Sequence, residues 1–383
     1  MNHLMRDERG MALAIAIFAL VIVGAMVAGA FFAGTQEQRV GENQRRVVQS
    51  YGIAEAGAQE RVLSWIPSTM NRVKQYPETS AVIPDQPAPG GTGRYFGTSY
   101  RLGPNVFLID VTGLETRSYG GETPGGGGAR QRVGLIARIA PIEFGIRASL
   151  TTQGGVSVGG NAEVDGNDRN PTGWVSCDPP GPAQAGVRDN GGTVTTGGNG
   201  EVNGNPPVVS DPTINDNTFT TFGGATFAQL AARANVVIGP GNYSTAPVVT
   251  NGVCNTTVPT NWGDGDNPSA PCGNYFPIIY ATGTITLNNT QGQGILLVNG
   301  DLNVQGSYQF YGIVIIQGDL KTAGGGTAEA HFWGGVLAKN ADLSVQNLSG
   351  KATLNFSSCS ILAALQAQSP ISPMRQRAYL WLY

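Results

Sequence analysis

Hydrophobic positions along the chain follow three patterns in three successive stretches. Residues 11–34 contain no charged side chain. Residues 35–66 lack proline and are rich in Gln, Glu, Arg and Ala, with spaced apolar residues such as Val47 and Ile53, which is typical of an amphipathic helix. Further along, short runs of β-branched and aromatic residues alternate with Gly, Pro and Asn, which is typical of strands and turns.

The first two stretches predict one long helix over residues 11–66. As a helix, the 24 residues from 11 to 34 are about 36 Å long, which is enough to cross a hydrocarbon core of about 30 Å. We therefore expect residues 11–34 to span a membrane. The rest of the helix ends before Pro67 and has one apolar face, so we expect that face to lie on another part of the protein.

Composition limits the class of protein. The chain has 383 residues, and its 56 Gly and 23 Pro exclude a compact helical domain. Charged residues are only 13% while apolar residues are 40%, so the chain is not of the disordered type. The net charge of −3 argues against a nucleic-acid partner. The length allows two or three domains with cores of their own.

Two short motifs flank the long apolar stretch. Arg9-Gly10-Met11 precedes it, and Ala54-Glu55-Ala56-Gly57 follows about forty residues later. In this respect the N-terminal part resembles type IV prepilins, and the PilX-like minor pilins in particular. The resemblance implies that residues 1–10 are a leader, and that a prepilin peptidase in the membrane cuts between Gly10 and Met11 and methylates the new N-terminus.

The fifth residue after that junction is Ile15, where most pilins carry a glutamate. In type IV pilins that carboxylate neutralises the terminal amine of the preceding subunit inside the low-dielectric fibre core. PilX-like pilins and the K-type pseudopilins of secretion systems tend to lack it, a pattern associated with an initiating or tip position. A plain signal anchor that is not cleaved is the alternative interpretation.

The resemblance therefore implies a minor pilin that supports pilus assembly and surface adhesion at or near the tip. Its expected partners are other minor pilins, the assembly machinery, the peptidase, the membrane and a surface ligand. The expected location is the bacterial inner membrane, with the globular part in the periplasm, and then the pilus and cell surface. The alternatives are a K-type pseudopilin, or a membrane-anchored extracellular β-helix that binds or degrades polysaccharide.

Residues 67–143 have the pattern of a small antiparallel sheet. Three strands are expected, at Arg94–Leu102, Val106–Glu115 and Arg130–Ile139, with a glycine-rich loop at 120–128 before the third. One apolar face of this sheet could cover the outer half of the helix, and pilins have the same arrangement. We therefore predict an α+β unit made of one long helix and a small antiparallel sheet.

Residues 144–359 contain a repeat. Residues 294–302 and 312–320 match in register with a spacing of 18 residues, and residues 335–343 follow as a looser copy 23 residues later. A period near 20 with short strands is typical of a parallel β-solenoid, here expected to be right-handed, in which each coil covers the next. The alternative is an antiparallel sandwich.

The C-terminal residues 360–383 are expected to cap the solenoid, because an open solenoid end exposes unpaired strand edges. Residues 360–368 are rich in Ala and Leu and can form a helix. The tail after them is strongly aromatic, which suggests a cap or a docking element.

The chain has four cysteines, an even number that is compatible with two disulfides in an oxidising compartment. Cys254 and Cys272 bracket 17 residues that are dense in Pro, Gly and Asn, and we predict that they are bonded. Cys177 and Cys359 would form the second pair. Four reduced, buried cysteines are the alternative.

Motifs for chemistry are scarce. The chain has no G-x-S-x-G, Walker, H-E-x-x-H or dinucleotide motif, so we expect neither an enzyme nor a bound cofactor. The lone His331 of the globular part is interpreted as a packed or surface residue. Asp264, Asp266 and Asn267 form a short loop of hard oxygen ligands that could bind Ca²⁺, but it lacks the spacing of an EF-hand, and an Asn/Gly/Asp turn between the two cysteines is the favoured interpretation.

Two aspartates recur at equivalent positions of the repeat. Asp301 and Asp319 would stack about 5 Å apart in successive coils. Such a pair could hold a cation or act as a carboxylate pair. The simpler interpretation is that each aspartate caps a turn at the corner of its coil.

Overall fold

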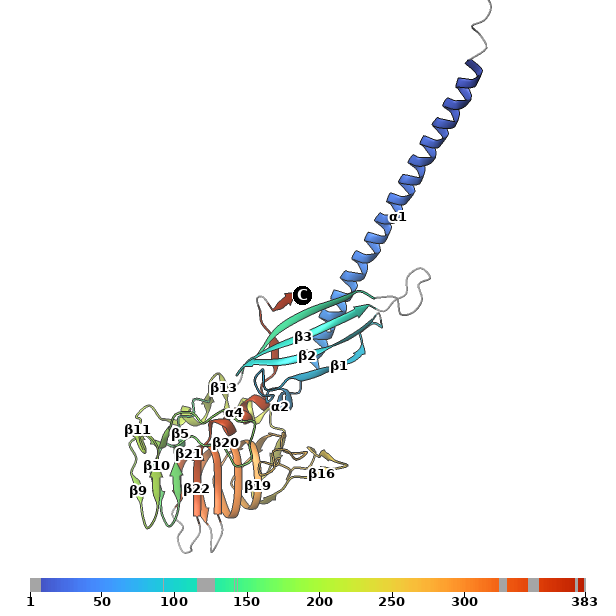
Figure 1. The fold of residues 1–383 in the computed structure, drawn as a ribbon. Coiled ribbons are helices and arrows are strands. Elements are labelled where there is room, and N and C mark those ends of the chain that lie inside the picture. Colours follow the sequence, from blue (N-terminus) through green and yellow to red (C-terminus); the bar gives the residue numbers. More distant parts are fainter. Residues whose placement is uncertain are drawn as a thin grey trace, which may run out of the picture.

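The protein consists of a long helix with a small antiparallel sheet, and a larger parallel sheet at the far end of it (Figure 1). A computed structural model describes residues 8–91, 93–115, 128–140, 142, 144–323, 329–343, 351–375 and 378–381. The loop predicted at 120–128 lies almost entirely outside these residues, as does most of the leader 1–10.

Helix α1 spans Glu8–Leu63, 56 residues in one piece, which corresponds to about 84 Å. The predicted helix covered residues 11–66. Only the last turns, from Ser50 onward, are buried against the sheet, whereas residues 12–35 are exposed on all sides. The sheet therefore covers a shorter part of the amphipathic half than we expected (Figure 1).

The antiparallel sheet has six strands, and the three predicted strands are among them. Its first four strands follow chain order: β1 (Ala81–Pro87), β2 (Gly93–Gly103), β3 (Val106–Glu115) and β4 (Arg130–Ile139). Strand β1 was missed because Pro84 and Pro87 interrupt it, and prolines are tolerated only on an edge strand such as this one.

The C-terminal tail differs from the predicted cap. Helix α4 (Ser358–Ala367) does pack on the parallel sheet, but the residues after it return to the antiparallel sheet. Strands β23 (Ile371–Pro373) and β24 (Tyr379–Trp381) both pair with β4. The physical reason is that β4 would otherwise present a row of unpaired backbone groups on that side.

The larger sheet has fourteen strands, and every pairing between them that the structure describes is parallel. The strands are β5 (Ala148–Thr152), β6 (Val156–Val158), β7 (Glu163–Asp165), β8 (Ala185–Asp189), β9 (Val194–Thr196), β10 (Glu201–Asn203), β11 (Val208–Ser210), β14 (Val236–Ile238), β15 (Gly241–Thr245), β18 (Ile278–Ala281), β19 (Ile285–Val298), β20 (Leu302–Ala323), β21 (Glu329–Leu343) and β22 (Lys351–Phe356).

Shorter elements lie outside the two large sheets. They are α2 (Pro67–Met70), the 3-10 helix η1 (Asp216–Phe219), α3 (Phe227–Ala231) and two small antiparallel pairs, β12 (Thr221–Phe222) with β13 (Ala225–Thr226) and β16 (Val249–Thr250) with β17 (Val253–Cys254).

The register of the repeat is set by glycines at its bends. Gly294 pairs with Gly312, the predicted spacing of 18 residues, but Gly312 pairs with Gly334, a spacing of 22 rather than the predicted 23. All three glycines have positive φ, and a Cβ on Gly334 would lie 1.8 Å from the carbonyl oxygen of Gly312. The stacked backbone bends at these glycines, rather than the matching apolar residues, therefore determine the register.

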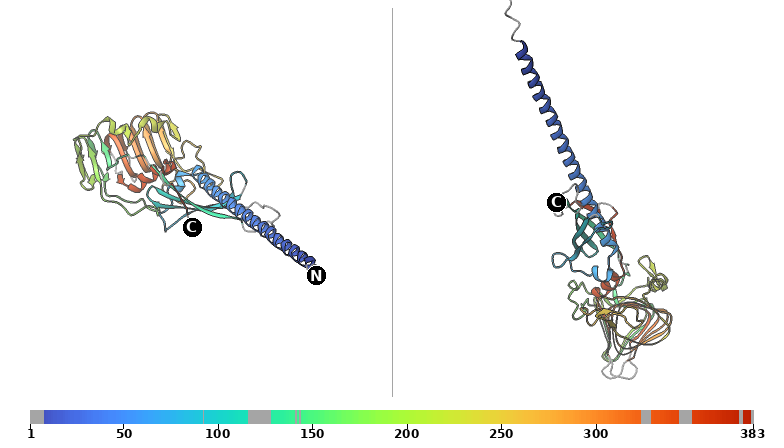
Figure 2. Two further views of the ribbon diagram at one scale, coloured as in Figure 1. Left: turned by 90° about the horizontal axis from the view of Figure 1, so that it is seen from above. Right: turned by 90° about the vertical axis from the view of Figure 1, so that its right-hand side faces the viewer.

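Strands in the parallel sheet do not follow chain order. Leu150 of β5 pairs with Val336 of β21, and Glu163 of β7 pairs with Thr353 of β22. The strands between residues 148 and 210 thus form one end of the stack, and β14, β15 and β18 form the other (Figures 1 and 2). The first strand of this part of the chain, β5, and the last, β22, therefore both pair with β21 in the middle of the stack.

Candidate functional site

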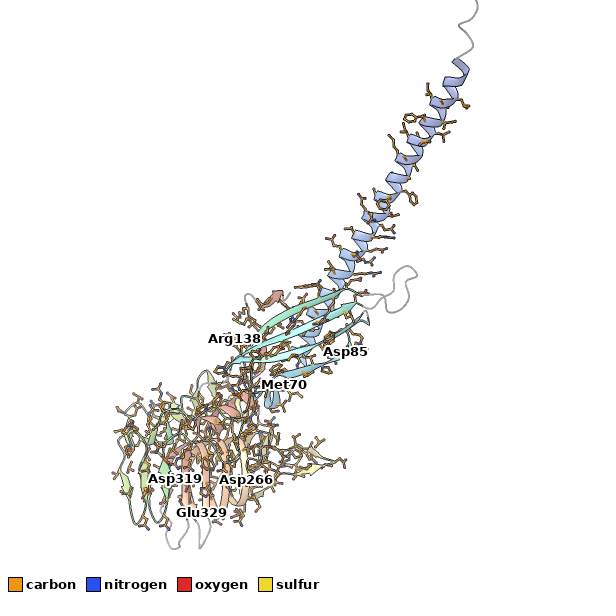
Figure 3. All side chains as sticks on the ribbon, in the orientation of Figure 1. Met70, Asp85, Arg138, Asp266, Asp319 and Glu329 are labelled. Atoms are coloured by element: carbon orange, nitrogen blue, oxygen red, sulfur yellow. A yellow bond between two sulfur atoms is a disulfide. The ribbon has the colours of Figure 1, made fainter. Side chains whose placement is uncertain are left out.

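The exposed apolar half of α1 is the most unusual surface of the molecule. An 18-residue window in it has a mean hydropathy of 2.7 and no buried residue, so the helix is long and apolar enough to cross a membrane. Ile15 is 65% exposed and Phe31 is 75% exposed. Figure 3 shows side chains that project outward along this part of the helix. Soluble surfaces rarely expose apolar areas of this size, so this segment requires a lipid or protein environment.

The predicted processing junction lies at the start of this helix. Gly10 and Met11 are both within the first turn of α1, which begins at Glu8. Ile15 follows one turn later and is exposed.

The docked end of α1, from Ser50 onward, is held by close backbone approach. Ala54 and Ala58 are completely buried against the sheet, and a Cβ on Gly57 would lie 2.5 Å from the Tyr95 ring. A Cβ on Gly113, on strand β3, would lie 2.3 Å from the carbonyl oxygen of Ser50. Small residues in the Ala54–Gly57 motif and on the sheet therefore let helix and strand approach each other more closely than larger residues would permit.

One buried asparagine joins the helix-and-sheet unit to the parallel unit. The Asn71 side chain accepts a hydrogen bond from Trp65 Nε1 at 2.7 Å. Its amide donates to the carbonyl oxygens of Gln366 and Ser369, at 2.6 and 2.9 Å, just where α4 ends. Asn71 is fully buried, so these bonds pair polar groups that have no access to water.

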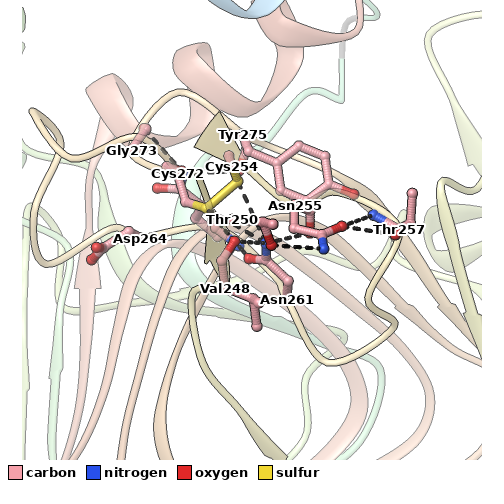
Figure 4. Close-up of a disulfide and its surroundings, with 12 residues drawn as sticks. Val248, Thr250, Cys254, Asn255, Thr257, Asn261, Asp264, Cys272, Gly273 and Tyr275 are labelled. Carbon is pink, nitrogen blue, oxygen red and sulfur yellow. Dashed lines mark hydrogen bonds between the residues drawn. A yellow bond between two sulfur atoms is a disulfide. The ribbon is translucent and has the colours of Figure 1, made fainter. Parts of the chain in front are cut away.

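Both predicted cysteine pairs are bonded in the structure. Cys254 joins Cys272, and Cys177 joins Cys359. The first bond lies beside the fully buried Asn261, whose amide donates to the carbonyl oxygens of Val248 and Asn255 (Figure 4). Together they fix the base of the β16–β17 hairpin.

The residues of the predicted calcium loop brace one another. Asp264 Oδ1 accepts hydrogen bonds from Gln291 Nε2 at 2.8 Å and from the backbone and side-chain amides of Asn267 at 3.2 Å. Asp266 accepts from the Tyr311 hydroxyl at 2.7 Å, and burial raises the pKa of that tyrosine, which keeps it a donor. These N–H and O–H groups point at the oxygens a cation would need, which favours the turn interpretation.

Asp301 and Asp319 are corner residues that link neighbouring strands. Asp301 accepts a hydrogen bond from the backbone N–H of Asp319 at 2.9 Å. Asp319 in turn accepts from Asn340 at 2.9 Å and pairs with Lys321 at 3.2 Å. His331 is partly exposed and lies 2.9 Å from Glu329 on the same strand. Among the described residues, no three His, Cys, Asp or Glu side chains are grouped so that they could hold a metal ion.

Comparisons with known proteins find no matching family and a weak structural similarity. No known family model matches the chain, and no curated protein matches it. Among solved structures, it is similar to the competence-associated pilin ComZ from Thermus thermophilus, with 13% sequence identity and a TM-score of 0.25. That similarity covers 88% of this chain and 96% of the other. A similarity this low identifies neither the fold nor the function.

Proposed function

We propose that this protein is a minor pilin of a type IV pilus, of the PilX-like kind, and that it acts through contacts rather than catalysis. The observation that carries the proposal is the division of α1. Its residues 12–35 are apolar and exposed on every side, and its last turns, from Ser50 onward, are docked through small residues onto an antiparallel sheet. A helix of this kind can reside in the inner membrane before assembly and in the core of a fibre afterwards.

In the proposed fibre, α1 packs laterally against the helices of neighbouring pilins. Helices in an apolar environment associate through van der Waals contact, which the side chains of residues 12–35 can supply. Ile15 places no carboxylate in this core. A subunit without a predecessor has no terminal amine to neutralise, so this residue supports a position at or near the tip.

The parallel unit would be the head that such a subunit displays outside the cell. We infer that its parallel stack forms a right-handed β-solenoid. The head is inserted into the antiparallel sheet, because the chain leaves that sheet after β4 and returns to it at β23. Two connections and the buried Asn71 bonds would hold the head firmly against loads on the pilus, and surface adhesion would occur there.

Processing provides the first test. We expect mass spectrometry of the mature protein to find Met11 at its N-terminus and Gly10→Val to keep the leader attached. Gly24→Val is a matched control, because Gly24 is in the same helix and has no neighbour within 4 Å. Cleavage that continues in Gly10→Val, or a mature chain that starts beyond Gly34, would contradict the pilin assignment.

The head can be removed with little disturbance to the rest, which provides the second test. Ile139 and Ile371 pair directly across strands β4 and β23, so a short Asn-Gly turn can replace the residues between them. We expect this variant to restore pili in a gene-deletion strain, counted by electron microscopy, and to lose surface adhesion. Wild-type piliation in the full deletion would exclude a role in assembly.

A further inference from the structure

A cavity of about 330 Å³ lies at the junction between the two units. Its walls come from helix α4, the residues around Phe144 that lead into the parallel sheet, the end of strand β22, the segment after β7 that contains Cys177, and the helix-and-sheet unit. Figure 1 shows α4 at this junction, next to α2. Phe144, Ile361, Leu362 and Leu365 supply apolar walls.

Two arginines line the same cavity. Arg72 donates to Asn274 Oδ1 at 3.0 Å and lies over the rings of Phe276 and Trp174, 4.7 and 5.3 Å from their centroids. Arg101 is only 6% exposed and donates to the carbonyl oxygens of Val73 and Pro104 at 3.2 and 3.1 Å. Neutral oxygens therefore accept some of the hydrogen bonds of these arginines without balancing their charge.

The charges in the cavity are not balanced. Within the described part of the chain, neither Arg72 nor Arg101 forms an ion pair, and Asp178 is the one carboxylate among the described lining residues. Burial lowers the pKa of Arg72 to about 10 and lowers the pKa of Arg101 as well, although attraction by Asp178 partly offsets the second shift. Burying a positive charge without a counter-charge is costly, so one further negative charge would be favourable here.

We propose that this cavity binds a small organic anion, a single carboxylate carried on a compact apolar group. The carboxylate would face Arg72, because a guanidinium presents paired N–H donors that match a carboxylate in geometry. The apolar group would occupy the space between Ile361, Leu362 and Leu365. A concave, mainly apolar site with a few convergent polar groups is the usual form of a small-molecule site.

Binding here would affect the connection between the two units. Arg72 and Arg101 belong to the helix-and-sheet unit, whereas α4 and Cys177 belong with the parallel unit. A ligand that contacts both sides stabilises the arrangement in which they meet. The anion would therefore strengthen the attachment of the parallel unit to the helix-and-sheet unit.

The test uses the full chain in a nonionic detergent and isothermal titration calorimetry. The probes are 4-phenylbutyrate, 4-phenylbutan-1-ol and 4-phenylbutylamine, which share one shape and differ in charge. We expect saturable one-site binding of the anion, and binding at least tenfold weaker for the alcohol and the amine. Arg72→Gln should weaken anion binding at least tenfold, and Arg72→Lys, which keeps the charge but loses the paired donors, less than that.

Two further variants separate binding from folding. Leu362→Trp should fill the cavity from a partly exposed position and abolish binding with little change in melting temperature. Arg94→Gln removes an exposed arginine of the antiparallel sheet and should leave binding unchanged. The proposal is overturned if the wild type shows no saturable binding of the anion, if Leu362→Trp binds it normally, or if the alcohol binds as tightly as the anion.

Discussion

The two sheets of this protein bury their apolar residues in different ways. The antiparallel sheet depends on other elements: α1 covers one face, and the C-terminal tail covers the edge of β4. The parallel sheet encloses its own core, in which residues from many strands, such as Leu296, Val314 and Val336, meet inside the stack. The first sheet is therefore sensitive to what docks on it, and the second is sensitive to how its strands stack.

This difference has a consequence for stability. Contacts of the antiparallel sheet converge on a few small residues under α1, so a single side chain can disrupt them. Contacts of the parallel sheet are spread over fourteen strands, and two disulfides tie together the elements beside it. We therefore expect a destabilising substitution in one unit to shift the melting transition of that unit separately from that of the other.

The largest effect is expected at Gly113. In Gly113→Val the new Cβ would meet the Ser50 carbonyl, which belongs to backbone and cannot rotate away, so α1 should not dock. Overpacking usually costs about 1–3 kcal/mol, and a rigid backbone clash costs more, so we expect the antiparallel unit to unfold while the parallel unit keeps its own melting transition. Calorimetry would show this. Gly103→Val, where no atom lies within 4 Å, is the control, and a single intact transition in Gly113→Val would refute the idea that docking is required.

Loss of the disulfides should destabilise the parallel unit next. In the chain-entropy model the bond across 182 residues, Cys177–Cys359, contributes about 5 kcal/mol, and the bond across 18 residues, Cys254–Cys272, about 3 kcal/mol. Serine double variants should show this order in denaturant midpoints, with the antiparallel unit nearly unaffected. Peptide mapping without reduction checks the pairing, and free thiols at Cys254 and Cys272 would contradict it.

Asn71 tests how strongly the two units are coupled. Asn71→Ala leaves the Trp65 N–H and the Gln366 and Ser369 carbonyls without their partner in a buried place, which should cost about 2 kcal/mol. Because the bonds to Gln366 and Ser369 cross the junction, both melting transitions should shift and move apart. Asn199→Ala removes an exposed hydrogen bond on the parallel unit and should change stability by less than about 0.5 kcal/mol. Equal effects of the two variants would indicate that Asn71 does not couple the units.

The smallest effect is a pH dependence confined to the parallel unit. Hydrogen bonds from Thr213, together with Arg188, lower the pKa of Asp211 from 3.8 to about 2. A lowered pKa in the folded state means that this carboxylate stabilises the unit above about pH 4 and loses that contribution as the pH falls towards 2. Asp211→Asn should therefore reduce the difference in urea midpoint between pH 5 and pH 2.5. Asp216→Asn, at a more exposed carboxylate, is the control.

Local patterns were sufficient where pairing is local. Strands Val106–Glu115 and Arg130–Ile139 occur at the predicted residues, because alternation with a turn on either side specifies an antiparallel meander. The spacing between Gly294 and Gly312 was also predicted, since the paired strands β19 and β20 repeat the same sequence pattern. For the third copy the predicted spacing was one residue too long. The sequence match begins at Gly335, whereas the glycine that pairs with Gly312 and has positive φ is Gly334.

Long-range placement could not be read from such patterns. Asn71 and Arg72 look like ordinary polar residues in the sequence, and they matter because residues about 200 to 295 positions away approach them. Leu150 lies beside Val336, and β23 lies beside β4, although no repeat or turn connects these segments. The backbone groups along a strand edge are chemically alike, so sequence pattern specifies that an edge must be paired, and the packing of the whole chain selects its partner.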